Sequence, residues 1–202
     1  MKWFLILFLS ILFSSFIIGH PVIWKKGLVF TTRFSDSMSD YRSHYSITNK
    51  WASGIHGLRL NQDNFVMWQN NYLLNRWNKP GSQANLYVFS GLGTNVNEEN
   101  SIIHFGVQTD WETRMIYTQL SYDSYLMDES VYKLNARIGV SPYLAEYSFL
   151  HSWIILQINT IIEGNKSETN IMPVLRFFKH NYLFEIGNNF KNSYLFTFMV
   201  HI

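Results

Sequence analysis

Large apolar residues occupy every second position in one segment of this chain after another. In one such segment Ile103, Phe105 and Val107 share one parity, whereas His104 and Gln108 share the other. Successive side chains of a β-strand point to opposite faces, so this period predicts strands with one apolar and one polar face. Helical periodicity is hard to find, and beyond residue 20 no apolar run is long enough for a membrane-spanning helix. We therefore expect an all-β chain.

Residues that favour turns separate the alternating segments. Clusters of Asn, Asp, Ser, Gly and Pro recur along the chain, and such clusters mark the ends of strands. They leave about twelve expected strands, at residues 27–34, 42–48, 52–60, 65–75, 84–92, 101–110, 114–123, 131–140, 150–162, 170–179, 182–188 and 193–202. The alternation does not assign the faces of the third and fifth of these. No linker, low-complexity tract or internal repeat interrupts the series, so residues 20–202 are expected to form one domain.

The first nineteen residues have a different character. Lys2 precedes an unbroken apolar run that ends at Gly19. A positive residue, an apolar stretch and a small residue at the cleavage position are typical of a secretory signal peptide. We expect residues 1–19 to be this signal peptide and His20 to begin the mature chain. An uncleaved membrane anchor is the alternative, although the run is shorter than the roughly 20 residues of a spanning helix.

Charge and cysteine content narrow the classes of protein. The chain has 16 basic and 14 acidic residues and no cysteine. This balance favours neither a nucleic-acid partner nor an acidic tail. Charged residues make up 15% of the chain, against about 25% in ordinary soluble domains. The absence of cysteine excludes a disulfide scaffold and a thiolate metal site.

Many antiparallel strands can form either a secreted β-sandwich or a membrane-spanning β-barrel. Sandwich strands are usually about 5–6 residues long, and their turns are richer in Gly and Pro than those of this chain. Membrane barrels have alternating segments of roughly ten residues, with the apolar faces toward lipid and the polar faces toward the lumen. The lengths of the expected strands favour the barrel, and the sandwich is the alternative.

The positions of tryptophan also favour the barrel. If alternate hairpin ends face the same side, five tryptophans fall at one end of the expected strands, namely Trp24, Trp51, Trp77, Trp111 and Trp153. Membrane barrels carry aromatic girdles where lipid meets water, because an indole ring can be buried while its N–H stays hydrated. We therefore expect these residues to form such a girdle.

The last segment, residues 193–202, carries a resemblance to a known class. Phe196, Phe198, Val200 and Ile202 alternate with more polar residues up to the end of the sequence. This pattern resembles the C-terminal assembly signal of bacterial outer-membrane β-barrel proteins. The resemblance implies an antiparallel transmembrane barrel in the outer membrane of a Gram-negative cell. It also implies outer-membrane lipid as the surroundings and the barrel-assembly machinery as a partner of this strand.

If the apolar faces contact lipid, the polar faces must line the lumen. The ionisable candidates for this lining include Asp123 and eight principal residues, namely Arg33, His44, His104, Asp110, Lys133, Arg137, Arg176 and Glu185. Polar groups enclosed in a barrel must bond to one another or to water. The expected function is therefore a structural or surface barrel, packed with cross-strand hydrogen bonds, or a narrow pore for a small polar solute. No cofactor is expected.

Catalysis and metal binding are the weaker alternatives. Some outer-membrane barrels are lipid hydrolases that use Ser and His. Here His151 and Ser152 are adjacent and must point to opposite faces, while His44 and Ser46 share a face but no orienting carboxylate can be assigned to them. An amine-terminal His20 could chelate copper through its imidazole, but no other spacing of histidines supports a metal site.

One hairpin gives a residue-level prediction. A two-residue turn at His180-Asn181 would place Lys179 opposite Tyr182 and Arg176 opposite Glu185. Asn tolerates the left-handed conformation that such turns require. This register puts both charges on the lumen face, so we expect an Arg176–Glu185 ion pair inside the barrel.

Overall fold

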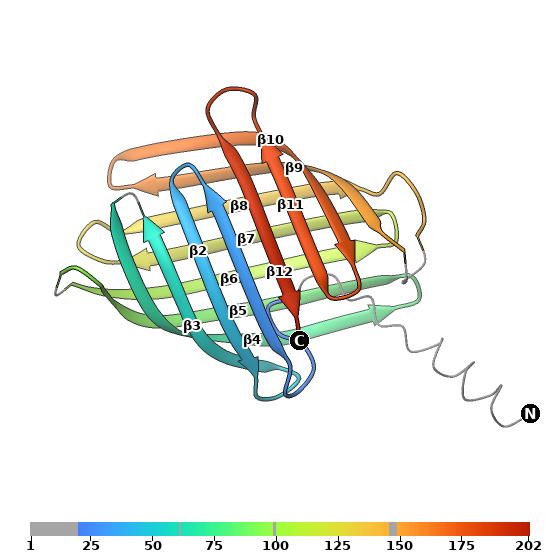
Figure 1. Cartoon of the computed structure of the whole chain (residues 1–202), viewed down its shortest axis with the longest axis horizontal. Coiled ribbons are helices and arrows are strands. Elements are labelled where there is room, and N and C mark those ends of the chain that lie inside the picture. The colour runs from blue at the N-terminus through green and yellow to red at the C-terminus, as the bar shows by residue number, and fades with distance from the viewer. Residues whose placement is uncertain (1–19, 61, 99, 146–148) are drawn as a thin grey trace, which may run out of the picture.

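The strands close into a barrel (Figure 1). The computed structural model describes residues 20–60, 62–98, 100–145 and 149–202, so the expected signal peptide lies outside the described residues. Within these residues there are twelve strands: β1 (Leu28–Ser35), β2 (Met38–Ser46), β3 (Trp51–Leu60), β4 (Asp63–Lys79), β5 (Ser82–Asn95), β6 (Ser101–Thr113), β7 (Ile116–Leu126), β8 (Val131–Val140), β9 (His151–Glu163), β10 (Lys166–Lys179), β11 (Tyr182–Asn188) and β12 (Tyr194–His201).

Each strand pairs antiparallel with its neighbours in sequence, and β1 pairs with β12 to close the sheet. The closing register runs from Val29 opposite His201 to Ser35 opposite Leu195. The last strand is therefore paired on both edges, with β1 and with β11. The expected all-β antiparallel barrel is confirmed, and the β-sandwich alternative is wrong because one closed sheet contains every strand.

The two ends of the barrel are named by the strand ends and connections that form them. The end where β1 begins and β12 finishes is called the terminal rim here, and the end formed by the β1–β2 and β11–β12 connections is called the distal rim (Figure 1).

The described residues contain no helix of the length and apolar character needed to cross a membrane.

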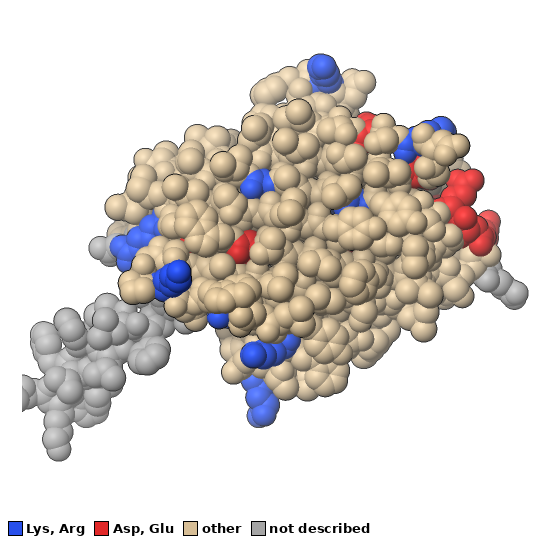
Figure 2. Space-filling view, turned by 180° about the vertical axis from the view of Figure 1, so that it is seen from behind, with Lys and Arg blue, Asp and Glu red and all other residues tan. Residues whose placement is uncertain are grey.

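The outward face is apolar along the strands, as the alternation predicts. On β4 the outward residues Val66, Trp68 and Leu74 are exposed, whereas Gln69 and Asn71 are buried inside. Figure 2 shows one face of the molecule on which Asp and Glu gather at one end, while much of the surface between the ends carries no charge. The strands thus present a lipid-compatible belt.

The β10–β11 hairpin has the predicted register. Lys179 pairs with Tyr182 and Arg176 pairs with Glu185. The turn is two residues long, and its left-handed residue is His180, with φ of 53°. The expectation that Asn makes the hairpin possible is thus wrong in detail, although the length and register are confirmed.

The strand boundaries differ from expectation mainly at the turns. The expected strands at 27–34 and 42–48 leave residues 35–41 as their connection, but β1 ends at Ser35 and β2 begins at Met38, so the connection is short. Strands β4 and β5 extend well beyond their expected ends, and a bulge lies between Leu73 and Asn75 where β4 pairs with β5.

The interior contains apolar clusters that the sequence reading did not expect. One, near the distal rim, is formed by Met38, Leu58, Leu60, Phe65, Met67, Ile102, Tyr125 and Val131. A second is formed by Tyr117, Trp153, Ile155, Met172, Val174 and Leu195. A third, near the terminal rim, is formed by Val22, Ala52, Leu73, Tyr87 and Phe89. The lumen is therefore a partly filled interior and not a uniformly polar channel.

Candidate functional site: the polar lumen

Two cavities of the described barrel form most of the polar lumen, and a third, of about 160 Å³, lies near the distal rim beside Leu60, Asn95 and Val131. The inner chamber has a volume of about 90 Å³ and reaches toward the terminal rim, where His20, Asp110 and Glu112 are part of its lining. The outer chamber has a volume of about 340 Å³ and reaches the distal rim at Asp36 and Asn192. Both are lined largely by polar side chains from many strands.

The two chambers meet at a shared set of residues. Arg33, Lys133, Asn135 and Arg137 line both of them. Arg33 comes from β1 and the other three from β8, where alternate positions face inward. We call these four residues the basic constriction, because they line both chambers and three of their four side chains are cationic.

The structure places the eight sequence-predicted lumen residues inside the barrel. The inner chamber is lined by seven of them, namely Arg33, His44, Asp110, Lys133, Arg137, Arg176 and Glu185. The eighth, His104, is buried behind Asp123, which also lines that chamber. Sequence reasoning missed Asp40, Arg42 and Glu112 in this interior, although their alternation with apolar neighbours was a usable signal.

Glu185 is the centre of a buried ionic network. Arg176 Nε donates to Glu185 Oε1 at 2.7 Å, which confirms the predicted pair. Arg137 Nη1 donates to both carboxylate oxygens, at 3.0 and 3.2 Å. Arg137 belongs to β8, so this carboxylate ties β8 to the β10–β11 hairpin across the lumen. A charge pair enclosed in this way is stable only while each partner remains.

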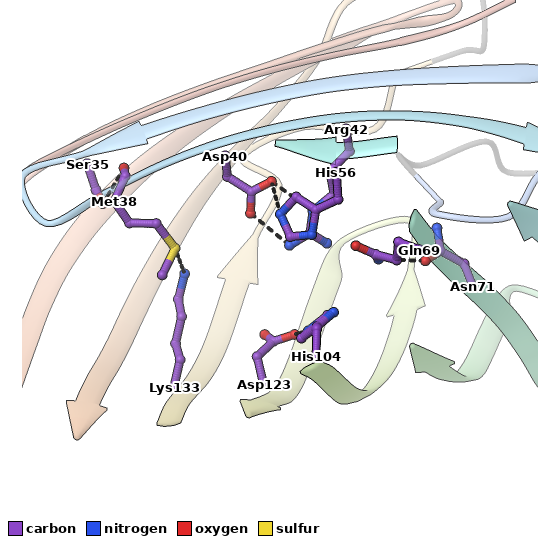
Figure 3. A network of polar contacts seen from close by, with 10 residues as sticks. All are labelled: Ser35, Met38, Asp40, Arg42, His56, Gln69, Asn71, His104, Asp123 and Lys133. Atoms are coloured by element: carbon purple, nitrogen blue, oxygen red, sulfur yellow. Dashed lines mark hydrogen bonds and ion pairs between the residues drawn. The ribbon is translucent and has the colours of Figure 1, made fainter. Parts of the chain in front are cut away.

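A second network joins β2, β3, β6 and β7 (Figure 3). Arg42 donates twice to Asp40, at 2.8 and 2.7 Å, and His56 Nε2 lies 3.2 Å from Asp40 Oδ1. His104 Nε2 lies 2.9 Å from Asp123 Oδ1. The rings of His56 and His104 contact each other edge to face, with their centroids 5.8 Å apart. Two His–Asp pairs therefore face each other inside the barrel.

A glycine makes room for one of these pairs. Gly106 is the partner of Asp123 in the register between β6 and β7. A Cβ atom at Gly106 would lie 2.7 Å from Asp123 Oδ1 and 2.9 Å from a ring carbon of Phe89. Only glycine therefore lets Asp123 reach His104 in this arrangement.

The lumen is narrowed by a contact between opposite walls. Lys133 Nζ lies 3.5 Å from Met38 Sδ (Figure 3). Met38 is on β2 and Lys133 on β8, which are six strands apart in either direction around the barrel. The distal apolar cluster, which contains Met38 and Val131, fills the space on one side of this contact.

Four of the five expected girdle tryptophans lie where the sequence reading placed them. Trp24, Trp77 and Trp111 are exposed near the terminal rim, and Trp51 is partly exposed and stacks on Tyr72.

Trp153 is the exception, and its assignment to the girdle is wrong. It is only 2% exposed and points into the barrel, where the centroids of its ring and the Tyr117 ring are 6.2 Å apart. Trp153 has the same parity as Gln157 and Asn159, which line the outer chamber, so the alternation of β9 already placed it on the lumen face. The girdle assignment followed the position of Trp153 at a strand end and overlooked this parity.

No catalytic arrangement is assembled at the Ser and His residues considered above. Ser46 Oγ accepts a hydrogen bond from the Ile23 backbone N–H at 3.2 Å. Ser152 Oγ lies 2.9 Å from the Tyr143 hydroxyl. Within the described residues no group of three or more His, Asp or Glu is arranged to hold a metal ion. His20 Nδ1, which a chelate with the α-amine would use, lies 3.0 Å from the Tyr87 hydroxyl.

The closed sheet, the apolar exterior and the polar interior define the fold as that of a twelve-stranded outer-membrane β-barrel. Three similar solved structures are described as porins. One is described as KdgM porin in complex with disordered oligogalacturonate (11% identity, TM-score 0.56, covering 87% of this chain and 97% of that one). Another is KdgM porin (12% identity, TM-score 0.53, covering 86% of this chain and 98% of that one). A third is NanC porin (12% identity, TM-score 0.50, covering 86% of this chain and 97% of that one).

Comparisons of the amino-acid sequence do not assign the chain to a protein family. No protein-family model matches the chain. No curated protein sequence matches it either. At identities near one in nine, the likeness to the porins establishes the fold alone.

Proposed function

We propose that this protein is a narrow outer-membrane pore for a small polar solute. The observation that supports this most directly is the meeting of the two polar chambers at Arg33, Lys133, Asn135 and Arg137. A solute that entered at the distal rim would pass the outer chamber and this basic constriction before it reached the inner chamber. The similar porin whose description names oligogalacturonate gives an example of a polar solute for this fold.

The distribution of side chains favours transport over catalysis. The buried charges engage one another in the Glu185 and Asp40 networks, and neither network presents an activated nucleophile to the lumen. Exposed apolar residues around the barrel support a position in lipid, and the doubly paired β12 supports recognition of residues 193–202 during assembly.

The test is conductance of the purified protein in planar lipid bilayers, together with swelling of liposomes in sugar solutions. Asn135→Trp would fill the constriction and is expected to lower conductance at least fivefold. Leu134→Trp is the matched control, because the neighbouring side chain faces outward and is 41% exposed. Heat-modifiable migration on gels would show that both variants are folded. Absence of channels from folded wild-type protein would contradict the proposal.

A further inference from the structure

Residues 20–23 fold back into the barrel before the first strand begins. The chain turns at Lys26, which has a φ of 71°, and the backbone N–H of Lys26 donates to Ser46 O at 2.7 Å. On the other side of this turn, His20, Val22 and Ile23 are only 6%, 1% and 6% exposed. The segment therefore lies inside the terminal rim and does not trail away from it.

Side-chain contacts hold the segment against the barrel wall. The carbonyl of Pro21 accepts a hydrogen bond from Asn71 Nδ2 at 3.3 Å, and His20 Nδ1 lies 3.0 Å from the Tyr87 hydroxyl. Val22 packs in the apolar cluster with Leu73 and Tyr87. These contacts come from β4 and β5, so the segment rests on one wall of the barrel.

Its attachment differs in kind from that of a strand. The closing pairs of β1 with β12 form a continuous ladder of seven residue pairs from Val29 to Ser35. Residues 20–23 take no part in any ladder, and the backbone N–H of Ile23 donates to a side chain, Ser46 Oγ. The segment can therefore move without opening the sheet.

The segment also borders the solute path proposed above. His20 and Pro21 line the inner chamber together with Asp110 and Glu112. Glu112 is 2% exposed, and its Oε1 has no hydrogen-bond partner among the described residues. If the chain is cleaved after Gly19, the new α-ammonium group of His20 would enter the chamber that these two carboxylates line, and opposite charges would favour its retention there.

We propose that residues 20–23 are a tethered plug that closes the terminal end of the inner chamber and moves aside during solute passage. Its relevance to transport rests on the proposed pore function, whereas its position in the barrel does not. If the chain is cleaved after Gly19, the plug is covalently joined to the barrel only through the turn at 24–27, and its other contacts are noncovalent.

Thiol labelling tests the position of the plug, because the natural chain has no cysteine. In folded protein, Val22→Cys is expected to react with a membrane-impermeant maleimide at least tenfold more slowly than Asn49→Cys, which is exposed at the same rim. Equal rates would overturn the proposal.

A second labelling experiment tests closure. Ser121 lines the inner chamber, so the Ser121→Cys thiol reports access to it. Replacement of residues 20–23 by Gly-Ser-Gly-Ser keeps the chain length and is expected to raise the labelling rate of this thiol at least fivefold. An unchanged rate would overturn the plug.

Conductance then relates the plug to transport. The Gly-Ser-Gly-Ser protein is expected to conduct at least twofold better than the wild type, and equal conductance of two conducting proteins would overturn the plug. If neither protein conducts, the pore function fails, while the two labelling experiments still decide whether the plug exists.

Discussion

Replacing Glu185 by Gln removes the one negative charge that two buried arginines share. Glu185 accepts three hydrogen bonds, at 2.7 Å from Arg176 and at 3.0 and 3.2 Å from Arg137. Its side chain is 1% exposed, so water cannot replace the lost charge. Removing one partner of a buried ion pair costs about 3–5 kcal/mol, and we expect Glu185→Gln to lower the free energy of unfolding by that amount.

Arg176→Gln should cost less than Glu185→Gln, because Glu185 then keeps Arg137 and only one group is lost. The double variant Arg176→Gln/Glu185→Gln should be more stable than the sum of the single effects predicts, since it leaves only Arg137 without its carboxylate. Arg137 also donates to Gln157 Oε1 at 2.7 Å, which limits that remaining cost.

The assay is reversible unfolding in urea with the protein in lipid vesicles, followed by tryptophan fluorescence. Glu168→Gln is the control, because Glu168 is exposed near the distal rim and its change should stay within about 0.5 kcal/mol. Additive effects of Glu185→Gln and Arg176→Gln, within about 0.5 kcal/mol, would refute the reasoning, because residues in one ionic network should be coupled.

Three further predictions concern the lipid face, the last strand and the constriction. Phe198→Asp should destabilise the barrel in vesicles by about 2 kcal/mol or more, because it puts a charge toward lipid. Thr197→Asp, on the lumen face, should be milder, because Arg33 lies opposite position 197 in the β1–β12 register and can pair with the new carboxylate; equal damage would contradict the assignment of faces. Removal of residues 193–202 should abolish insertion into the outer membrane, and recovery of heat-modifiable barrel from the membrane fraction would contradict this. Lys133→Glu should shift the reversal potential in a salt gradient toward cation selectivity, whereas Lys50→Glu in an exposed turn should leave it nearly unchanged.

The barrel could be predicted from the sequence because its strands are amphipathic and long. On β8, Leu134 and Ile138 face outward while Lys133 and Arg137 face inward, and a single period places all four. Register could be predicted where a two-residue turn connects two such strands, as at β10–β11. In both cases the information is local.

The prediction was wrong where both faces of a strand are apolar. Trp153 and Ile155 point inward on β9 while Ile154 points outward, so only the later polar position Gln157 on that strand identifies its lumen face. On β5 the aromatic rings of Tyr87 and Phe89 lie in the lumen, which is why the faces of that strand were not assigned. For β5 only the partners across the barrel decide the direction of the side chains.

The contacts of charged residues with distant strands could also not be predicted from the sequence. The pairing of Arg176 with Glu185 follows from one hairpin, but the addition of Arg137 depends on how β8 approaches β11. The return of residues 20–23 into the lumen likewise depends on a pocket built by β3, β4 and β5. No periodicity in the segment itself indicates it.

The contact between Met38 and Lys133 has a consequence for the size of solute that the barrel can accept. Because β2 and β8 touch across the interior, the distal half of the lumen is divided. The outer chamber is lined by β1, β8, β9, β10 and β12, and the smaller distal cavity is lined by β3, β4, β5, β8 and β9. A molecule that enters the outer chamber from the distal side would therefore meet an opening framed by five of the twelve strands. The width of that opening depends on those five strands, so the number of strands in the barrel overstates the cross-section available to a solute there.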